Sequence, residues 1–248
     1  MFDFSIMGIL GEEKTFKQKL FRFMVSRAGG IVTLDIGEVK RLEKRFPHLK
    51  GHVAFIPYGT QLDFFKPTGE EEVMQIFVPG TDPDRDYKTL FAACEGLPAT
   101  VLFTTYESRL PILGLLPVFV KHRRLSSDEL RHEYARSAMV AIPLDTSSGL
   151  NDAMGVSVVQ EALAMGKAVV ASHTSAMASF IEDGKNGLLV PERDPQAMRA
   201  AIERLLVDKA LRDSLGREAR RYAENHLDPD RCTKDLANYF KRLIADKH

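Results

Sequence analysis

The stretch over residues 147–191 constrains the fold of this chain more than any other part of the sequence. It reads, in order, as a loop containing glycine and serine, a short helix, an apolar run at 168–171, a second loop and a second strand. A short apolar run of β-type residues between turn residues is typical of a strand inside a parallel sheet. This order of elements predicts an α/β unit with an anion-binding site beside the edge of a sheet.

The ends of the central helix can be placed from the sequence. Ser157 and Gln160 have the spacing of a capping box, in which the hydroxyl accepts from the third helical amide and the Gln side chain bonds back to the Ser amide. We therefore expect the helix to begin near Val158. Gly166 supplies the left-handed residue that commonly closes a helix, which places the end near Met165.

The loop before this helix has the composition of a phosphate-binding loop. Its backbone amides and hydroxyl groups can converge on the positive end of the helix dipole, where phosphate is favoured. Glu161, one turn inside the helix, could accept hydrogen bonds from a diol, such as a ribose, attached to the same phosphate. The alternative is that Glu161 is one of the acids that the dipole favours in any first turn, and that the serines are ordinary loop residues and caps.

Three motifs in this part of the chain resemble one known family. Residues 161–171 read Glu-Ala-Leu-Ala-Met-Gly-Lys-Ala-Val-Val-Ala, residues 183–191 read Asp-Gly-Lys-Asn-Gly-Leu-Leu-Val-Pro, and Asp194-Pro195 precedes a helix. Together they resemble the donor-binding half of glycosyltransferase family 4 (group 1), the retaining nucleotide-sugar transferases of GT-B fold. The resemblance implies a Rossmann-like parallel sheet flanked by helices, the C-terminal domain of that fold, in which Glu161 holds the donor ribose.

The chain departs from the family pattern before this helix. The family usually has another Glu eight residues before Glu161, in contact with the sugar or beside it, whereas this chain has Ala153 with Asp152 adjacent. Ser148-Gly149 resembles the version of the loop found in one branch of the family. The donor-binding residues implied in this half are Ser148, Gly149, Gly155, Ser157 and Glu161.

A second part of the expected site follows the apolar run at 73–78. In the family this turn carries Gly-Arg and then a Lys before the next helix, and the two cations hold the donor diphosphate. Here Gly80 is present, Thr81 replaces the Arg and Arg85 stands where the Lys would be. Because a guanidinium can bind phosphate bidentately, we expect Arg85 at the diphosphate beside Gly80 and Thr81, with Lys88 as the reserve candidate.

Two basic residues of the expected site have ordinary alternatives. Arg85 could instead be a solvated loop charge that pairs with Asp84 or Asp86. Arg123 follows a strand at the level where relatives hold the nucleotide base, largely through backbone groups, and is the weaker candidate. Its side chain could equally belong to a solvated basic loop.

Residues 56–67 resemble the hinge that joins the acceptor and donor domains in this family, with Tyr58 and Gln61 in place of the usual Asn and Asp. A chain of 248 residues can bury one core and part of a second, whereas a GT-B enzyme has two Rossmann-like domains. We therefore expect a remnant of an N-terminal, acceptor-side domain and hinge over 1–66, a donor-binding domain over 67–228 and a crossover helix over 229–248. A mostly missing N-terminal domain, or a partner subunit, would complete the enzyme.

Strands and helices are expected to alternate along the chain. The expected strands cover 31–34, 53–56, 73–78, 100–105, 118–121 and 139–144, and the expected helices include 39–46 and 87–94. Ser126 and Glu129 form a second capping box, and Asp194 is expected to cap a helix with Pro195 at its first position. This alternation implies a parallel sheet with ligands at the carboxyl ends of its strands.

The balance of charge bears on the class of partner. Lys plus Arg and Asp plus Glu both number 34, which argues against a general nucleic-acid binder and favours small molecules. Cys94 and Cys232 are too few for a disulfide framework or a zinc site, so a cytoplasmic location fits. The apolar run at 110–120 contains two prolines and is shorter than the ~20 residues of a spanning helix. No transmembrane segment is expected, and peripheral contact with a membrane stays open.

The residues and the resemblance together predict a retaining glycosyltransferase of hexosyltransferase type. It would transfer a sugar from a nucleoside-diphosphate sugar to a glycan, lipid or small-molecule acceptor, with Arg85 and Glu161 as candidate catalytic residues and no metal or other cofactor. Stabilising the charge of the leaving diphosphate would be the main catalytic contribution. The alternatives are a non-catalytic nucleotide-sugar-binding subunit or module, and a sugar-nucleotide epimerase of GT-B fold.

Overall fold

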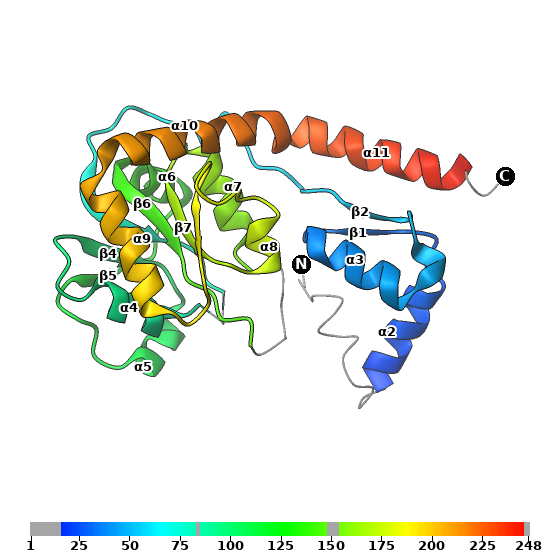
Figure 1. The fold of residues 1–248 in the computed structure, drawn as a ribbon, viewed down its shortest axis with the longest axis horizontal. Helices are drawn as coiled ribbons and strands as arrows, with labels where there is room; N and C mark the ends of the chain where they lie inside the picture. The colour runs from blue at the N-terminus through cyan, green and yellow to red at the C-terminus, as the bar shows by residue number, and fades with distance from the viewer. Residues whose placement is uncertain (1–15, 83–84, 148–153, 246–248) are drawn as a thin grey trace.

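The computed structural model describes residues 16–82, 85–147 and 154–245 of the chain. These residues form a large lobe built around a parallel sheet and a small N-terminal lobe, which lie side by side (Figure 1). Two C-terminal helices, α10 (Lys209–His226) and α11 (Pro229–Ala245), run one after the other across both lobes. Among the described residues, every helix is too short or too polar to cross a bilayer.

The large lobe contains a six-stranded sheet in which all paired strands are parallel, in the order β5-β4-β3-β6-β7-β8. Its strands are β3 (Val73–Val78), β4 (Thr100–Phe103), β5 (Val120–His122), β6 (Ser137–Ile142), β7 (Val169–Ser172) and β8 (Leu188–Val190). Expected and observed bounds agree at 73–78 and differ by one or two residues at most other strand ends. The predicted α/β fold class, a Rossmann-like parallel sheet flanked by helices, is confirmed.

The helices of the large lobe cover both faces of this sheet. Their bounds are α4 (Tyr87–Cys94), α6 (Ser127–Arg136), α7 (Val156–Ala164) and α9 (Pro195–Val207), with shorter pieces at η2 (Glu107–Arg109), α5 (Leu110–Leu113) and α8 (Ser175–Ala178). The capping box of Ser126 and Glu129 is confirmed, and Asp194 caps α9 by accepting from the amide of Ala197. The three shorter pieces were not anticipated from the sequence.

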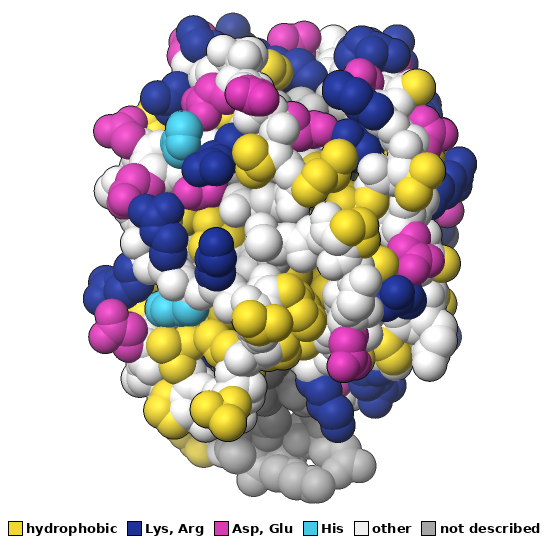
Figure 2. All heavy atoms as spheres, turned by 90° about the vertical axis from the view of Figure 1, so that its left-hand side faces the viewer, with side chains coloured by type: hydrophobic (Ala, Val, Ile, Leu, Met, Phe, Trp, Pro, Cys, Tyr) yellow, Lys and Arg dark blue, Asp and Glu magenta, His cyan; other side chains and the backbone are white. Residues whose placement is uncertain are grey.

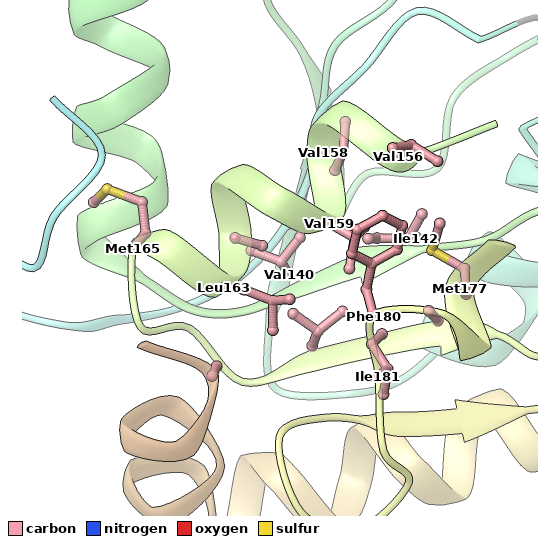
Figure 3. Close-up of a cluster of buried hydrophobic side chains, with 14 of the residues drawn as sticks. Val140, Ile142, Val156, Val158, Val159, Leu163, Met165, Met177, Phe180 and Ile181 are labelled. Atoms are coloured by element: carbon pink, nitrogen blue, oxygen red, sulfur yellow. The ribbon is translucent and has the colours of Figure 1, made fainter. Parts of the chain in front are cut away.

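Two apolar cores lie on opposite faces of the sheet because neighbouring strand residues point to opposite sides. Phe77 and Ile142 face the cluster under α7, whereas Ile76 and Met139 face the cluster under α4 and α9. Figure 3 shows the first cluster, where side chains of α7 pack onto β6 and onto Phe180. Burial on both faces explains why the central strands read as continuous apolar runs.

The start of α7 differs from the expectation. The helix begins at Val156, and its N-cap is Gly155 in the left-handed conformation with φ +75°. Ser157 is therefore already helical and cannot serve as the cap, and Gln160 Nε2 instead donates to the carbonyl oxygen of Val156 at 3.3 Å. The predicted capping box is wrong because a glycine two residues earlier permits the turn. The predicted end is confirmed, with Gly166 at φ +64°.

The small lobe contains α2 (Phe16–Ser26), β1 (Ile31–Thr33), α3 (Ile36–Arg45), η1 (Pro47–Leu49) and β2 (Val53–Phe55), with β1 and β2 parallel. Helix α11 packs on this lobe, since the Tyr239 hydroxyl contacts the carbonyl oxygens of Ile31 at 3.1 Å and His52 at 2.7 Å. The chain thus returns to its first lobe at its end. The three domain boundaries proposed from the sequence stay predictions.

The two lobes also contact one another directly. Asp35, which is buried, accepts a 2.6 Å hydrogen bond from the Ser175 hydroxyl of α8, and the amide of Ile36 donates to the Ser179 hydroxyl at 2.9 Å. The rings of Phe55 and Phe180 pack edge to face beside them. The start of α3 is therefore fixed against α8 by polar and apolar contacts together.

Candidate functional site

A hollow of about 300 Å³ lies where β3 and β4 end and α7 begins. This is the carboxyl edge of the sheet, where α/β proteins of this topology bind ligands. Its walls include four residues proposed from the sequence, Gly80, Thr81, Ser157 and Glu161. The lining residues are Pro79, Gly80, Thr81, Asp82, Thr104, Leu130, Ser157, Val158 and Glu161.

Gly80 forms one wall of this hollow in a conformation that glycine favours. Its φ is +105°, and its amide donates a 2.8 Å hydrogen bond to the Thr104 hydroxyl at the end of the neighbouring strand. A Cβ at this position would lie 2.5 Å from Arg85 Nη2 and 3.1 Å from Val158 Cγ2. The absence of a side chain therefore lets the backbone, the buried guanidinium and the start of α7 approach one another closely.

Arg85 lies behind Gly80 with its side chain fully buried. Nη2 and Nε donate to Asp82 Oδ2 at 3.0 and 3.2 Å, whereas Nη1 is buried and has no partner among the described residues. Asp86 does not take part, because it caps α4 through the amide of Thr89, and Asp84 lies outside the described residues. A buried cation with an unsatisfied donor favours an anion nearby.

Glu161 is one of the two acidic residues that line the hollow, the other being Asp82, and its environment raises its pKa to about 7. Burial of the carboxylate is the main cause, and a 2.8 Å hydrogen bond from the Tyr134 hydroxyl to Oε2 opposes it. Tyr134 is itself fully buried, which raises the pKa of its phenol well above the usual value. The Glu161 carboxyl is therefore poised so that hydrogen-bond donors from a ligand would favour its ionised form.

Ser157 contacts a residue of the segment that joins the two lobes. Its hydroxyl lies 2.6 Å from that of Tyr58, which belongs to the segment after β2 and is half exposed. Among the described residues, no side chain caps the first turn of α7, so its amides remain available at the edge of the hollow. The Tyr58–Ser157 contact thus brings the segment that joins the lobes to the positive end of the helix dipole.

The structure separates some proposed site residues from this hollow. Lys88 is exposed and lines a different hollow with Asp145 and Arg193. Arg123 forms ion pairs with Glu129 and Glu133 at 2.9 Å. Gly155 starts α7, as described, while Ser148 and Gly149 lie outside the described residues. The roles proposed for Lys88 and Arg123 stay predictions that this geometry does not favour.

Arg109 is a cation that the sequence motifs missed. It lies in η2, after the end of β4, and its Nη1 donates to the carbonyl oxygen of Thr81 at the wall of the hollow. Its guanidinium also lies 5.5 Å from the centre of the Tyr106 ring. No local pattern marks Arg109, and only the neighbouring positions of β3 and β4 in the sheet bring it to Thr81.

The part of the chain that the structure describes contains no group of three or more His, Cys, Asp or Glu side chains suited to hold a metal ion. Cys94 is buried, which raises the pKa of its thiol to about 12, and Cys232 is buried as well. Whether the site works without a metal stays a prediction. Both thiols belong to packed regions away from the hollow.

Comparison with known proteins relates part of this chain to one enzyme family. Residues 113–222 match the family model described as group 1 glycosyl transferases. The D-inositol 3-phosphate glycosyltransferase of Salinispora tropica is 33% identical over 121 residues, which cover 49% of this chain and 24% of that protein. The match supports a relationship to group 1 glycosyltransferases, over about a quarter of the length of that relative. The matched segment contains Tyr134, Ser157 and Glu161.

Solved structures resemble nearly the whole chain. Sucrose-phosphate synthase from Thermosynechococcus elongatus gives a TM-score of 0.78 at 20% identity, over 98% of this chain and 67% of that chain. Anabaena HepE, solved in complex with UDP and glucose, gives 0.77 at 16% identity, over 94% and 69%. At these identities the likeness concerns the fold, and it agrees with the predicted GT-B class.

Proposed function

We propose that this chain forms the donor-binding part of a retaining glycosyltransferase, which transfers a sugar from a nucleoside-diphosphate sugar to an acceptor. The observation that carries the proposal is that Glu161, the uncapped start of α7 and Gly80 meet at one hollow, with the buried Arg85 directly behind Gly80. The match of residues 113–222 to group 1 glycosyl transferases supports it. The completed enzyme would need further residues from an acceptor-side domain or a partner subunit.

The charged side chains that line the hollow, Asp82 and Glu161, are both acidic, so a diphosphate there would rely on the helix amides and on cations behind the lining. The amides at the start of α7 present partial positive charge, and Arg85 adds a full charge in a buried setting where water screens it weakly. Asp82 neutralises part of that charge, so a second cation is needed. We infer that Arg109 supplies it, because Arg109 reaches from η2 to the carbonyl oxygen of Thr81, the residue that replaces the Arg of the family pattern.

We infer that Glu161 binds the ribose of the donor. Tyr134 holds Oε2, and Oε1 has no hydrogen-bond partner among the described residues. A ribose diol donates two hydrogen bonds, which favour the ionised carboxylate and offset the cost of its burial. Transfer would then depend on the cations and helix amides that stabilise the leaving diphosphate, as sugar transfer develops negative charge there.

Calorimetric titration with UDP, GDP and ADP tests this proposal. We expect one of the three to bind with a dissociation constant in the micromolar range, its monophosphate to bind more weakly and its nucleoside more weakly still. Glu161→Gln should lower the affinity about tenfold, because the neutral amide accepts hydrogen bonds from a diol less strongly than a carboxylate. Glu203→Gln is the matched control, since Glu203 is an exposed acid on α9.

Two results would contradict the proposal. One is the absence of binding by a chain whose cooperative unfolding shows that it is folded. The other is an equal loss of affinity in Glu161→Gln and Glu203→Gln.

The stereochemistry of the reaction needs a separate experiment. Proton NMR of slow donor hydrolysis should show the sugar released first with the anomeric configuration of the donor. Release of the opposite anomer would refute the retaining mechanism, and an absence of turnover with intact binding would favour a non-catalytic module.

A further inference from the structure

The segment over residues 110–119 is apolar on two opposite sides. One set of side chains, spaced by three residues, packs against the core under α4 and α9; it consists of Leu110, Leu113, Leu116 and Phe119. A second set with the same spacing points away from the protein, with exposed fractions of 84% for Ile112, 100% for Leu115 and 99% for Val118. The inward set fixes the segment, so the outward set is held on the surface of a packed lobe.

Exposure of this kind is unusual for a segment that is anchored. Isolated exposed apolar residues are common, but a group of large ones on a fixed segment marks a surface that binds something apolar. Polar residues at these three positions would serve the packed lobe equally well, because none of the three side chains contributes to its core. Tyr106, which is half exposed, extends the same group toward η2.

The charged residues of this part of the sequence are mostly basic. Residues 106–124 carry four Lys or Arg side chains and a single carboxylate, that of Glu107, in a chain whose formal net charge is zero. Arg109 and Arg123 are engaged within the protein, whereas Lys121 and Arg124 are exposed on and after β5. Figure 2 looks onto this side of the molecule and shows hydrophobic side chains gathered on its lower part, with Lys and Arg and also some Asp and Glu side chains around them.

We propose that residues 106–124 form a surface that binds the face of an anionic lipid bilayer. Ile112, Leu115 and Val118 would enter the boundary between headgroups and acyl chains, while Lys121 and Arg124 contact anionic headgroups. The combination of apolar tips with flanking cations is what such a boundary recognises, whereas a nucleic acid would use the cations alone. The segment lies on the membrane and does not cross it.

The proposal is independent of sugar transfer, because vesicle binding needs neither donor nor acceptor. It can be tested by flotation of the full chain with vesicles of phosphatidylcholine alone and with vesicles that also contain phosphatidylglycerol. We expect strong binding to the anionic vesicles and weak binding to the neutral ones. Raising sodium chloride from about 0.05 M to about 0.5 M should lower the bound fraction severalfold without abolishing it, because salt screens the charges and leaves apolar insertion intact.

Variants separate the two parts of this surface. The double variant Leu115→Asp, Val118→Asp should reduce partitioning into anionic vesicles at least about tenfold, because it removes apolar insertion and adds like charge. Lys121→Glu with Arg124→Glu should reduce it about tenfold or more in anionic vesicles and leave neutral vesicles unaffected. Val207→Asp is the matched control, since Val207 is 87% exposed at the end of α9, and it should bind as the wild type does.

All of the substituted positions are exposed, so we expect the variants to unfold at the same temperature as the wild type. Thermal unfolding of each variant is measured alongside flotation. Three results would overturn the proposal: no binding of the wild type to anionic vesicles at low salt, unchanged binding of the Leu115 and Val118 double variant, or an equal loss in Val207→Asp. A wild type that dimerises, loses dimerisation in the double variant and ignores vesicles would assign the surface to a second copy of the chain instead.

Discussion

The Tyr134 hydroxyl donates a 2.8 Å hydrogen bond to Glu161 Oε2, and its next acceptor, the carbonyl oxygen of Val158, lies 3.5 Å away. The Tyr134 ring is packed edge to face against Phe65 and Phe77, so the hydroxyl cannot turn to solvent. The protein thus holds one oxygen of the Glu161 carboxylate through a fully buried phenol. This makes Tyr134 a positioning residue for the carboxylate that we propose binds the ribose.

Tyr134→Phe should shift the pH dependence of nucleotide binding. The hydrogen bond from Tyr134 lowers the pKa of Glu161 against the effect of burial, so its loss should raise that pKa above about 7. Binding that needs the carboxylate would then be weaker at pH 7 by several-fold and would recover at more alkaline pH. Titrations across pH 6 to about 9 measure the midpoint. A lower thermal stability with an unmoved midpoint would reduce Tyr134 to a packing role.

Glu161→Gln should stabilise the free protein at alkaline pH. Because the pKa of Glu161 is raised in the folded state from 4.5 to about 7, the folded state binds more protons than the unfolded state between these values. Stability that is present below pH 4.5 is therefore lost as the pH rises through about 7. The variant lacks this loss, so its free energy of unfolding should exceed that of the wild type by about 1–3 kcal/mol at pH 8. Urea unfolding at pH 5 and pH 8 measures the gap, which must widen with pH.

Arg109→Ala should weaken the binding of a nucleoside diphosphate about tenfold and leave binding of the parent nucleoside nearly unchanged. The reason is that Arg109 contacts the Thr81 carbonyl, on the side of the hollow where we propose that the diphosphate binds. Calorimetry with the nucleoside and its mono- and diphosphate gives the three affinities. Arg204→Ala, on the exposed side of α9, is the control for a general change of charge. An equal loss for all three ligands would place Arg109 outside the phosphate site.

Gly80→Ala should disturb the position of Arg85. A methyl group there meets Arg85 Nη2 at 2.5 Å and adds strain at φ +105°, so we expect a loss of about 1–3 kcal/mol in stability and a clear loss of diphosphate affinity. Gly69→Ala separates the two causes, because Gly69 has φ +73° and a methyl group there would meet nothing within 4 Å. Gly69→Ala should lower the stability through backbone strain and leave the diphosphate affinity unchanged. Intact affinity in Gly80→Ala would disconnect Arg85 from the ligand.

Much of the fold follows from local sequence. The apolar run at 73–78 and the helix at 87–94 appear with the expected bounds, because one is buried on both faces and the other has Asp86 as a cap. The capping box failed at Ser157 while it held at Ser126, and the difference lies in the residues before each serine. Gly155 can adopt the left-handed turn that starts a helix early, whereas Leu125 is followed directly by an extended Ser126.

The candidate site was only partly predictable for a different reason. Glu161 and Gly80 belong to local motifs, so the sequence points to them. Tyr134, Arg109 and Tyr58 reach the hollow from other elements, and only the order of strands and the placement of the small lobe bring them there. Such contacts depend on tertiary structure and leave no spacing pattern in the chain.

The path of the chain between the lobes has a mechanical consequence. The chain passes between the lobes twice, at residues 56–72 and at residues 227–228, and a 2.9 Å hydrogen bond from the Thr60 amide to the Leu227 carbonyl oxygen ties the two passages together. Two connecting segments that are bonded to each other at one point restrict separation of the lobes there, so we expect the lobes to move relative to each other mainly by rotation about that point. For a given angle, atoms far from that point travel furthest. Tyr58, two residues from Thr60, would move little in such a rotation, so we expect its contact with Ser157 to persist and the more distant contact between Asp35 and Ser175 to resist the rotation.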